Sequence, residues 1–125
     1  MKQDKLRGWS RLLPAFANSV AGFKTAWSEP AFFMEVWFVV LMFPFAFLLG
    51  QDWLQITFLI SILVLVPLVE LINTGIESAI DRVGLEWHEM SKRAKDLGSA
   101  AVFLSIMLCG GVWVSAIFVY WQRLS

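Results

Sequence analysis

Three long stretches without Asp, Glu, Lys or Arg constrain the fold of this chain more than any other feature. They are residues 36–51, 53–69 and 97–122. A helix that crosses a bilayer needs about 20 mostly apolar residues, so only the third stretch is long enough without charged residues. The first must include residues 30–35, and the second must continue past Glu70. We therefore predict an all-α membrane protein with transmembrane helices at 30–50, 53–80 and 96–121.

The composition agrees with this class. Hydrophobic residues make up 58% of the 125 residues and charged residues only 16%, which is atypical of a soluble globular domain. The length predicts a single membrane domain over residues 1–125. Cys109 is the only cysteine, which excludes an intrachain disulfide and a thiolate metal cluster, so we expect it to be a small packing residue.

The basic residues predict the orientation in the membrane, because cytoplasmic flanks retain Lys and Arg whereas short translocated loops lack them. The turn around residues 50–52 has no basic residue. Five of the ten precede the first span and four lie between the second and third (Lys2, Lys5, Arg7, Arg11 and Lys24; Arg82, Lys92, Arg93 and Lys95). In a bacterial inner membrane, this places the N-terminus in the cytoplasm and the C-terminus in the periplasm.

Residues 9–28 predict a helix of a different kind. Their apolar residues share one face at helical spacing, whereas Arg11 and Asn18 point away from it (Trp9, Leu12, Leu13, Phe16, Val20, Phe23 and Trp27). Tryptophans at both ends and neighbouring basic residues are typical of a helix that lies in the membrane interface. The alternative is an amphipathic helix packed on its own protein. Pro14 should kink the helix unless it begins near Leu13.

The second span carries polar residues on one face. At 100° per residue, Glu70, Asn73, Glu77 and Asp81 fall within roughly 80° of arc. An ionised carboxylate inside a bilayer costs at least about 2.5 kcal/mol, so this face should turn toward protein, water or metal. A solvated helix end would explain Glu77 and Asp81 but not Glu70. Glu70 lies about 10 Å deeper than Glu77 at 1.5 Å per residue, which predicts a lipid partner for Glu70 and a cytosolic solute for Glu77.

Two further features indicate a phosphate ligand. Glu29 lies at the start of the first span, level with Glu77, and such a carboxylate pair suits Mg²⁺, which takes oxygen ligands. Lys95 precedes the third span, where its charge and a helix N-terminus would attract phosphate, although such lysines also serve as topological anchors. The chain has no glycine-rich phosphate loop and no two-histidine zinc motif.

The segment before the third span predicts a loop. Residues 91–98 form the clearest polar connector in the sequence. His88 is the only histidine, and we expect His88 and Glu86 either to contact a nucleotide or to cap the loop.

The segments VELINTGIESAIDRVG and EWHEMSKRAKDLGSAAV, with GFKTAW and EPAF upstream, resemble the small integral-membrane diacylglycerol kinases of bacteria. The resemblance covers residues 9–121. It implies a homotrimer whose protomers have three transmembrane helices and an interfacial helix. It also implies phosphorylation of diacylglycerol to phosphatidic acid by ATP and Mg²⁺, at cytoplasmic-side sites shared between subunits, with no nucleic acid partner.

The resemblance assigns residue roles as well. Glu70 would be the general base, Glu29 and Glu77 would bind the metal, and Asn73 and Asp81 would support them. The contacts to ATP would be Arg11, Asn18, Glu29, Glu77, Glu86, Trp87, His88, Lys95 and Asp96. The contacts to the lipid would be Arg11, Ala15, Ser19, Glu70, Ser99 and Trp113. Asn18 and Trp87 stand where the best-known members have tyrosines, and Met34 replaces a glutamine.

Two alternatives remain open. A kinase for an isoprenoid alcohol such as undecaprenol would use the same catalytic residues. A non-enzymatic membrane protein could use the glutamates to line a water-filled path. The second alternative explains less well why the carboxylates gather in the cytoplasmic half of the spans.

Overall fold

The computed structural model describes residues 8–125. A short 3-10 helix, η1 (Gly8–Arg11), leads into four α-helices: α1 (Leu12–Trp27), α2 (Pro30–Leu49), α3 (Trp53–Val83) and α4 (Glu89–Leu124). By length and composition, α2, α3 and α4 can each cross a membrane. The predictions of an all-α chain and of three candidate spans are therefore confirmed.

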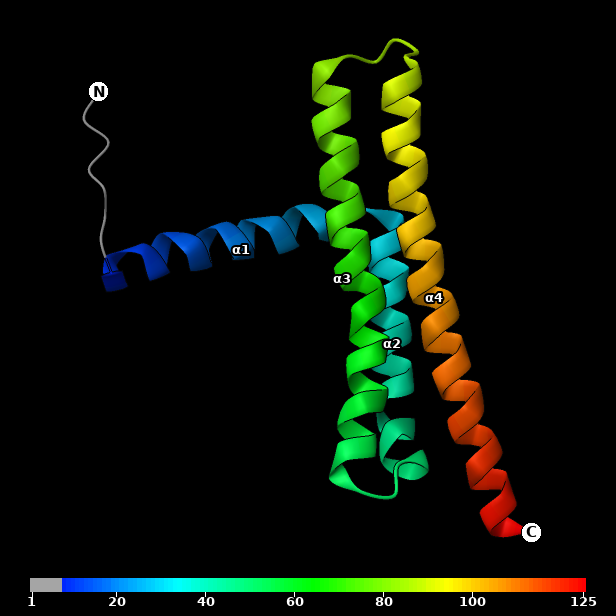
Figure 1. Ribbon diagram of the computed structural model, residues 1–125. Helices are drawn as coiled ribbons and strands as arrows, with labels where there is room; N and C mark the ends of the chain where they lie inside the picture. Colours follow the sequence, from blue (N-terminus) through cyan, green and yellow to red (C-terminus); the bar gives the residue numbers. More distant parts are fainter. Residues whose placement is uncertain (1–7) are drawn as a thin grey trace.

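The three long helices form a bundle in which α3 packs against both α2 and α4 (Figure 1). The core takes two residues from each helix, and all six are buried (Ala46, Leu49, Leu59, Leu63, Cys109 and Trp113). Trp113 Nε1 on α4 donates a hydrogen bond to the backbone oxygen of Leu59 on α3 at 3.3 Å. This bond ties an aromatic side chain to a neighbouring helix and so helps to set the register of α3 against α4.

The end of the bundle at the α2–α3 turn is closed by a contact with the C-terminal turn of α4. Arg123 Nη2 donates to the backbone oxygen of Leu49 at 3.0 Å, at the C-terminal end of α2. With its amide turned to match, the Gln51 side-chain oxygen accepts from Arg123 Nε at 3.0 Å. Asp52 Oδ1 caps α3 by accepting from the backbone N–H of Gln55 at 2.9 Å. The turn thus satisfies helix-end groups that would otherwise lack partners.

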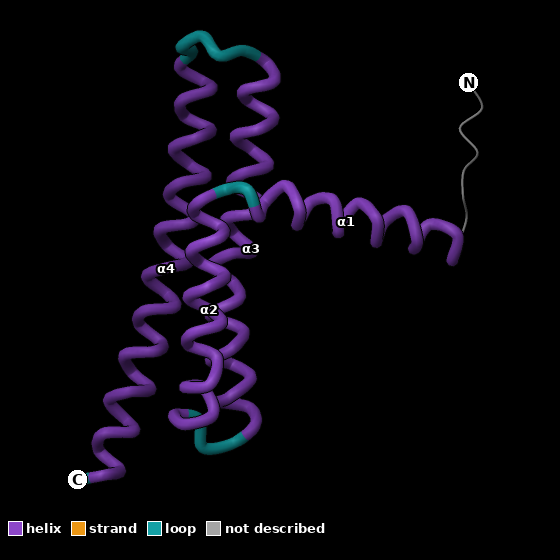
Figure 2. Tube along the Cα trace, turned by 180° about the vertical axis from the view of Figure 1, so that it is seen from behind, coloured by secondary structure: helices purple, strands orange, loops and turns teal. Residues whose placement is uncertain are grey.

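At the opposite end, α3 and α4 continue beyond the start of α2 (Figure 2). The 31 residues of α3 span about 46 Å at 1.5 Å per residue, which exceeds the roughly 30 Å hydrocarbon core of a bilayer. His88 caps α4 through Nδ1, which accepts from the backbone N–H of Met90 at 3.1 Å. His88 thus caps α4, and its contact with a nucleotide stays a prediction.

The prediction of a polar connector at residues 91–98 is wrong, because these residues form the first turns of α4. Polar side chains do not prevent a helix when a cap starts it and neighbouring turns support one another. Here the His88 cap is followed by an ion pair one turn along the helix, between Lys92 Nζ and Asp96 Oδ2 at 2.5 Å. The connection between α3 and α4 is confined to residues 84–88.

Helix α1 leaves the bundle and runs across it rather than along it (Figures 1 and 2). Pro14 lies in its first turn, where proline is tolerated. Ala26 is its only buried residue. The predicted apolar face is exposed throughout (Trp9, Leu12, Leu13, Phe16, Val20, Phe23 and Trp27). Within residues 8–125, most of this face is therefore not covered by its own chain, although Trp27 at its end packs edge-to-face on Phe33 of α2, with ring centroids 5.2 Å apart.

Candidate active site

Four polar residues of α3 share one face, and their burial changes along the helix. Glu70 and Asn73 are buried with 8% and 7% of their surface exposed, Glu77 is half-buried, and Asp81 is exposed. Asn73 Nδ2 donates to Glu77 Oε1 at 3.2 Å. Asn73 follows Glu70 by three residues, so the two side chains are neighbours on the helix surface. The α3 face thus runs from a buried carboxylate to a solvated one, with one amide between them.

Two glutamates of α2 join this face to form an acid cluster, which we define as Glu29, Glu35, Glu70 and Glu77. Glu29 lies at the N-cap of α2 with an extended backbone and is exposed. The negative charges of Glu77 and Glu29 both act on Glu70, and that of Glu70 acts on Glu35. Because like charges at short range repel one another, a cation placed here would relieve the repulsion.

Glu35 is the member of the acid cluster to which the sequence analysis gave no role. Its side chain is half-buried, and Oε2 is buried without a hydrogen-bond partner among residues 8–125. A signal was present in the sequence, because a carboxylate within a membrane span is a candidate functional group by default. Glu35 meets this criterion as well as Glu70 does, because it lies within the first predicted span.

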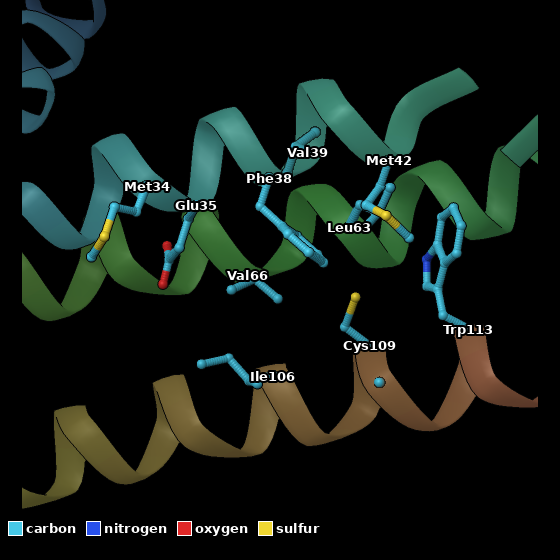
Figure 3. Close-up of a pocket in the computed structure, with 11 residues that line it drawn as sticks. Met34, Glu35, Phe38, Val39, Met42, Leu63, Val66, Ile106, Cys109 and Trp113 are labelled. Atoms are coloured by element: carbon cyan, nitrogen blue, oxygen red, sulfur yellow. The ribbon is translucent and has the colours of Figure 1, made fainter. Parts of the chain in front are cut away.

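A cavity of about 430 Å³ opens between α2, α3 and α4 beside the acid cluster. Figure 3 shows Met34 and Glu35 at one end, Trp113 at the other, and Phe38 between them. Apart from Glu35 the cavity is lined by apolar side chains, Cys109 and Gly110. It could therefore accept a hydrocarbon chain whose polar end lies next to Glu35.

Lys95 lies across from the α3 face. Its Nζ forms an ion pair with Asp81 Oδ1 at 2.6 Å, which joins α4 to α3. Both side chains are close to half-exposed, so the pair adds little stability. Its effect is to hold an ammonium group beside the solvated end of the acid cluster, where a phosphate could meet it.

The carboxylate oxygens of the acid cluster suit Mg²⁺, which does not need a site made entirely of protein ligands. Among residues 8–125, no group of three or more His, Cys, Asp or Glu side chains could hold a metal ion. Mg²⁺ usually takes only one or two carboxylates and completes its octahedron with water and phosphate oxygens. Glu29 and Glu77 therefore fit an ion that arrives together with a phosphate ligand.

A family model described as "Prokaryotic diacylglycerol kinase" matches residues 17–117, a range that includes the whole acid cluster and Lys95. The chain belongs to the prokaryotic diacylglycerol kinase family. Three relatives named "Diacylglycerol kinase" support this assignment. The protein of Haemophilus influenzae is 38% identical over 91% of this chain and 98% of its own length.

The other two relatives give similar values. The protein of Escherichia coli K12 is 41% identical over 85% of this chain and 88% of its own length. That of Pseudomonas aeruginosa is 40% identical over 86% of this chain and 89% of its own length. Similarity to this family therefore extends well beyond the acidic face of α3.

Several residues to which family resemblance gave roles lie apart from the acid cluster in the single chain. Arg11, Ala15, Asn18 and Ser19 belong to η1 or α1, and α1 leads away from the bundle (Figure 1). Ser99 is exposed on α4, and Glu86 and Trp87 are exposed in the loop between α3 and α4. Asp96 is paired with Lys92. The roles of these residues stay predictions, and the resemblance expects a neighbouring subunit to complete the site.

Ser19 lies nearest to α3 among these residues of α1. Together with Phe23, it lines a groove of about 460 Å³ whose other wall includes Leu71 and Ser78 of α3. That wall lies beside the face that carries Glu70 and Glu77, at a different angle around the helix. Ser19 Oγ donates to the backbone oxygen of Ala15 at 3.1 Å. Ser19 thus lies beside α3, at a groove next to the face that carries Glu70 and Glu77.

Proposed function

We propose that the chain transfers the γ-phosphate of ATP to diacylglycerol and forms phosphatidic acid at the acid cluster. Family membership makes it a lipid kinase. The observation that carries the proposal is the position of Glu70, which is buried on the same α3 face as the Asn73–Glu77 pair. A carboxylate placed in this way can serve a membrane-bound alcohol, while Glu77 serves a soluble phosphate.

Glu70 acts as the general base in this proposal. Its carboxylate takes the proton from the lipid hydroxyl, whose oxygen then bonds to the γ-phosphorus while the bond to the ADP oxygen breaks. Phosphoryl transfer depends mainly on positioning the reactants and on neutralising charge. Asn73 lies between Glu70 and Glu77 on the α3 face, and its hydrogen bond to Glu77 holds the phosphate-side carboxylate in place.

Glu29 and Glu77 are the residues that would hold Mg²⁺, which when bound neutralises charge on the phosphates. Lys95 adds a positive charge from α4, and its ion pair with Asp81 keeps it beside the cluster. This arrangement replaces the glycine-rich loop of soluble nucleotide-binding folds. Contacts from Arg11, Asn18, Glu86, Trp87, His88 and Asp96 to ATP belong to the same proposal.

The hydrocarbon part of the lipid is proposed to enter the cavity between α2, α3 and α4. Its apolar lining matches an acyl chain, and its polar end at Glu35 lies within the acid cluster. An isoprenoid alcohol could occupy such a cavity too. The relatives named "Diacylglycerol kinase" favour diacylglycerol, and they also weigh against a non-enzymatic protein that conducts ions.

The proposed assembly is a homotrimer in a bacterial inner membrane, with the acid cluster facing the cytoplasm and the C-terminus the periplasm. The distribution of basic residues supports this orientation. The exposed apolar face of α1 suits a helix in the membrane interface. A neighbouring subunit would bring Arg11, Ala15, Ser19 and Ser99 to the lipid.

The proposal is tested with the purified full chain in phospholipid vesicles. With Mg²⁺ and ATP, diacylglycerol should be phosphorylated at least about tenfold more efficiently than undecaprenol, because the two lipids differ in the groups next to the hydroxyl. Radiolabelled phosphate in extracted lipid is the measurement. Transfer to undecaprenol alone would establish the alternative substrate, and ion flux without transfer to any lipid would refute the kinase.

Filling the cavity should weaken lipid binding selectively. Ile106 lines the cavity from α4 and is 48% exposed, so Ile106→Trp adds bulk there without overpacking the core. We expect the KM for long-chain diacylglycerol to rise about fivefold, since a few lost methylene contacts have that order of effect, while the KM for ATP stays constant. The matched control is Ile117→Trp, which is 50% exposed on the same helix. Equal KM values in both variants would remove the cavity from the lipid site.

A further inference from the structure

We propose that Gly98 of α4 is a positioning residue for the kinase reaction. By having no side chain it leaves room for the amide of Asn73, and through that amide it holds Glu77 in the orientation that binds Mg²⁺ and ATP. This inference rests on the proposed function, in which Glu77 serves the metal and the nucleotide.

The space at Gly98 is occupied by one particular group. Gly98 is buried in α4, where a Cβ atom would overlap Asn73 Oδ1 and would crowd Asn73 Cγ at 3.3 Å. The same Cβ would lie 3.9 Å from Asn73 Cα, which is an ordinary van der Waals distance. The backbones of α3 and α4 therefore leave room for alanine at this position. The side-chain amide of Asn73 is the group that blocks it.

The orientation of this amide is determined by its partner. Glu77 carries a carboxylate, which accepts hydrogen bonds and donates none, so Asn73 must turn Nδ2 toward Glu77 Oε1, at 3.2 Å. Oδ1 then points toward Gly98, where it is buried and accepts no hydrogen bond from any residue of 8–125. The oxygen is kept there only by available space. Filling that space forces the amide to rotate and to leave Glu77.

Helix propensity alone predicts that Gly98→Ala is favourable, whereas the clash with Asn73 predicts that it is harmful. Gly98 lies inside α4, where alanine is more favourable than glycine because it restricts the unfolded backbone. Without the Asn73 amide, Gly98→Ala should therefore stabilise the helix. A loss of function in this variant would have to come from the side chain on the facing helix.

The test compares Gly98→Ala with Gly75→Ala in the full chain in vesicles. Gly75 is an exposed residue of α3, and an added Cβ there has nothing within 4 Å. We expect Gly98→Ala to raise the KM for Mg²⁺–ATP at least about tenfold, the order expected when a carboxylate loses a hydrogen bond. The KM for diacylglycerol should change less than twofold, and Gly75→Ala should change neither constant. Identical constants in both variants would overturn the proposal.

A double variant separates this role from helix packing. Asn73→Ala removes the amide, so adding Gly98→Ala to it should change the KM for Mg²⁺–ATP no further. If Gly98→Ala alone fails to fold, the double variant should regain the melting temperature of Asn73→Ala, because no clash remains. Penalties that multiply, or a double variant that also fails to fold, would show that Gly98 acts on helix packing instead.

The same experiment distinguishes the two proposals. An unsubstituted chain that phosphorylates no lipid would refute the proposed function and this inference with it. An active chain whose nucleotide KM is insensitive to Gly98→Ala would refute this inference alone.

Discussion

Glu70→Gln is expected to lower the turnover number by more than about 100-fold, within the range for loss of a general base. Glutamine has nearly the same size and shape, so it fills the same buried position, where Glu70 is 8% exposed. It cannot take a proton from the lipid hydroxyl. The measurement is kcat at saturating ATP and diacylglycerol, with helical content and oligomeric state recorded on the same preparation.

The matched control for this variant is Glu89→Gln. Glu89 is an exposed glutamate in the first turn of α4, outside the acid cluster, and its substitution removes the same charge. We expect near-normal kcat from the control. Near-normal kcat in Glu70→Gln as well would remove Glu70 from the mechanism and leave the acid cluster without its base.

Glu77→Gln should raise the concentration of Mg²⁺ needed for half-maximal activity by at least about tenfold. Changes to groups that only orient a metal ligand already cost 10- to 100-fold, so neutralising the ligand itself should cost no less. The amide oxygen of glutamine can still accept the hydrogen bond from Asn73 Nδ2, so the local geometry is retained while the charge is lost. Activity measured against Mg²⁺ concentration at fixed ATP checks this.

Two comparisons make the Glu77 result specific. Glu89→Gln should leave the Mg²⁺ requirement unchanged, since Glu89 lies outside the acid cluster. In Glu77→Gln, the KM for diacylglycerol should stay the same, because Glu70 and the cavity are untouched. An unaltered Mg²⁺ requirement in Glu77→Gln would assign the metal to other residues.

The parts of the fold that could be predicted from sequence are those governed by one helix and its solvent. The charge-free stretches predicted three spans because a bilayer excludes ionised groups, and periodicity placed Glu70, Asn73 and Glu77 on one face. Polarity alone predicts the wrong structure for residues 91–98, because the His88 cap and the Lys92–Asp96 pair support a helix there.

The features that could not be predicted depend on how two helices are aligned. The contact of Gly98 with Asn73 follows from the register of α4 against α3, to which the Trp113–Leu59 and Lys95–Asp81 contacts contribute. No periodicity within one helix determines that register. The proximity of Glu35 to Glu70 likewise requires α2 to be placed beside α3.

Helix α3 is continuous from Trp53 to Val83, and this continuity has a consequence for how the two reactants meet. Along this one helix, Glu70 and Glu77 are separated by about 10 Å, at 1.5 Å per residue. Because both belong to the same helix, the helical rise sets their separation along its axis. Diacylglycerol and ATP would therefore each have to reach a different level along α3 before they could react.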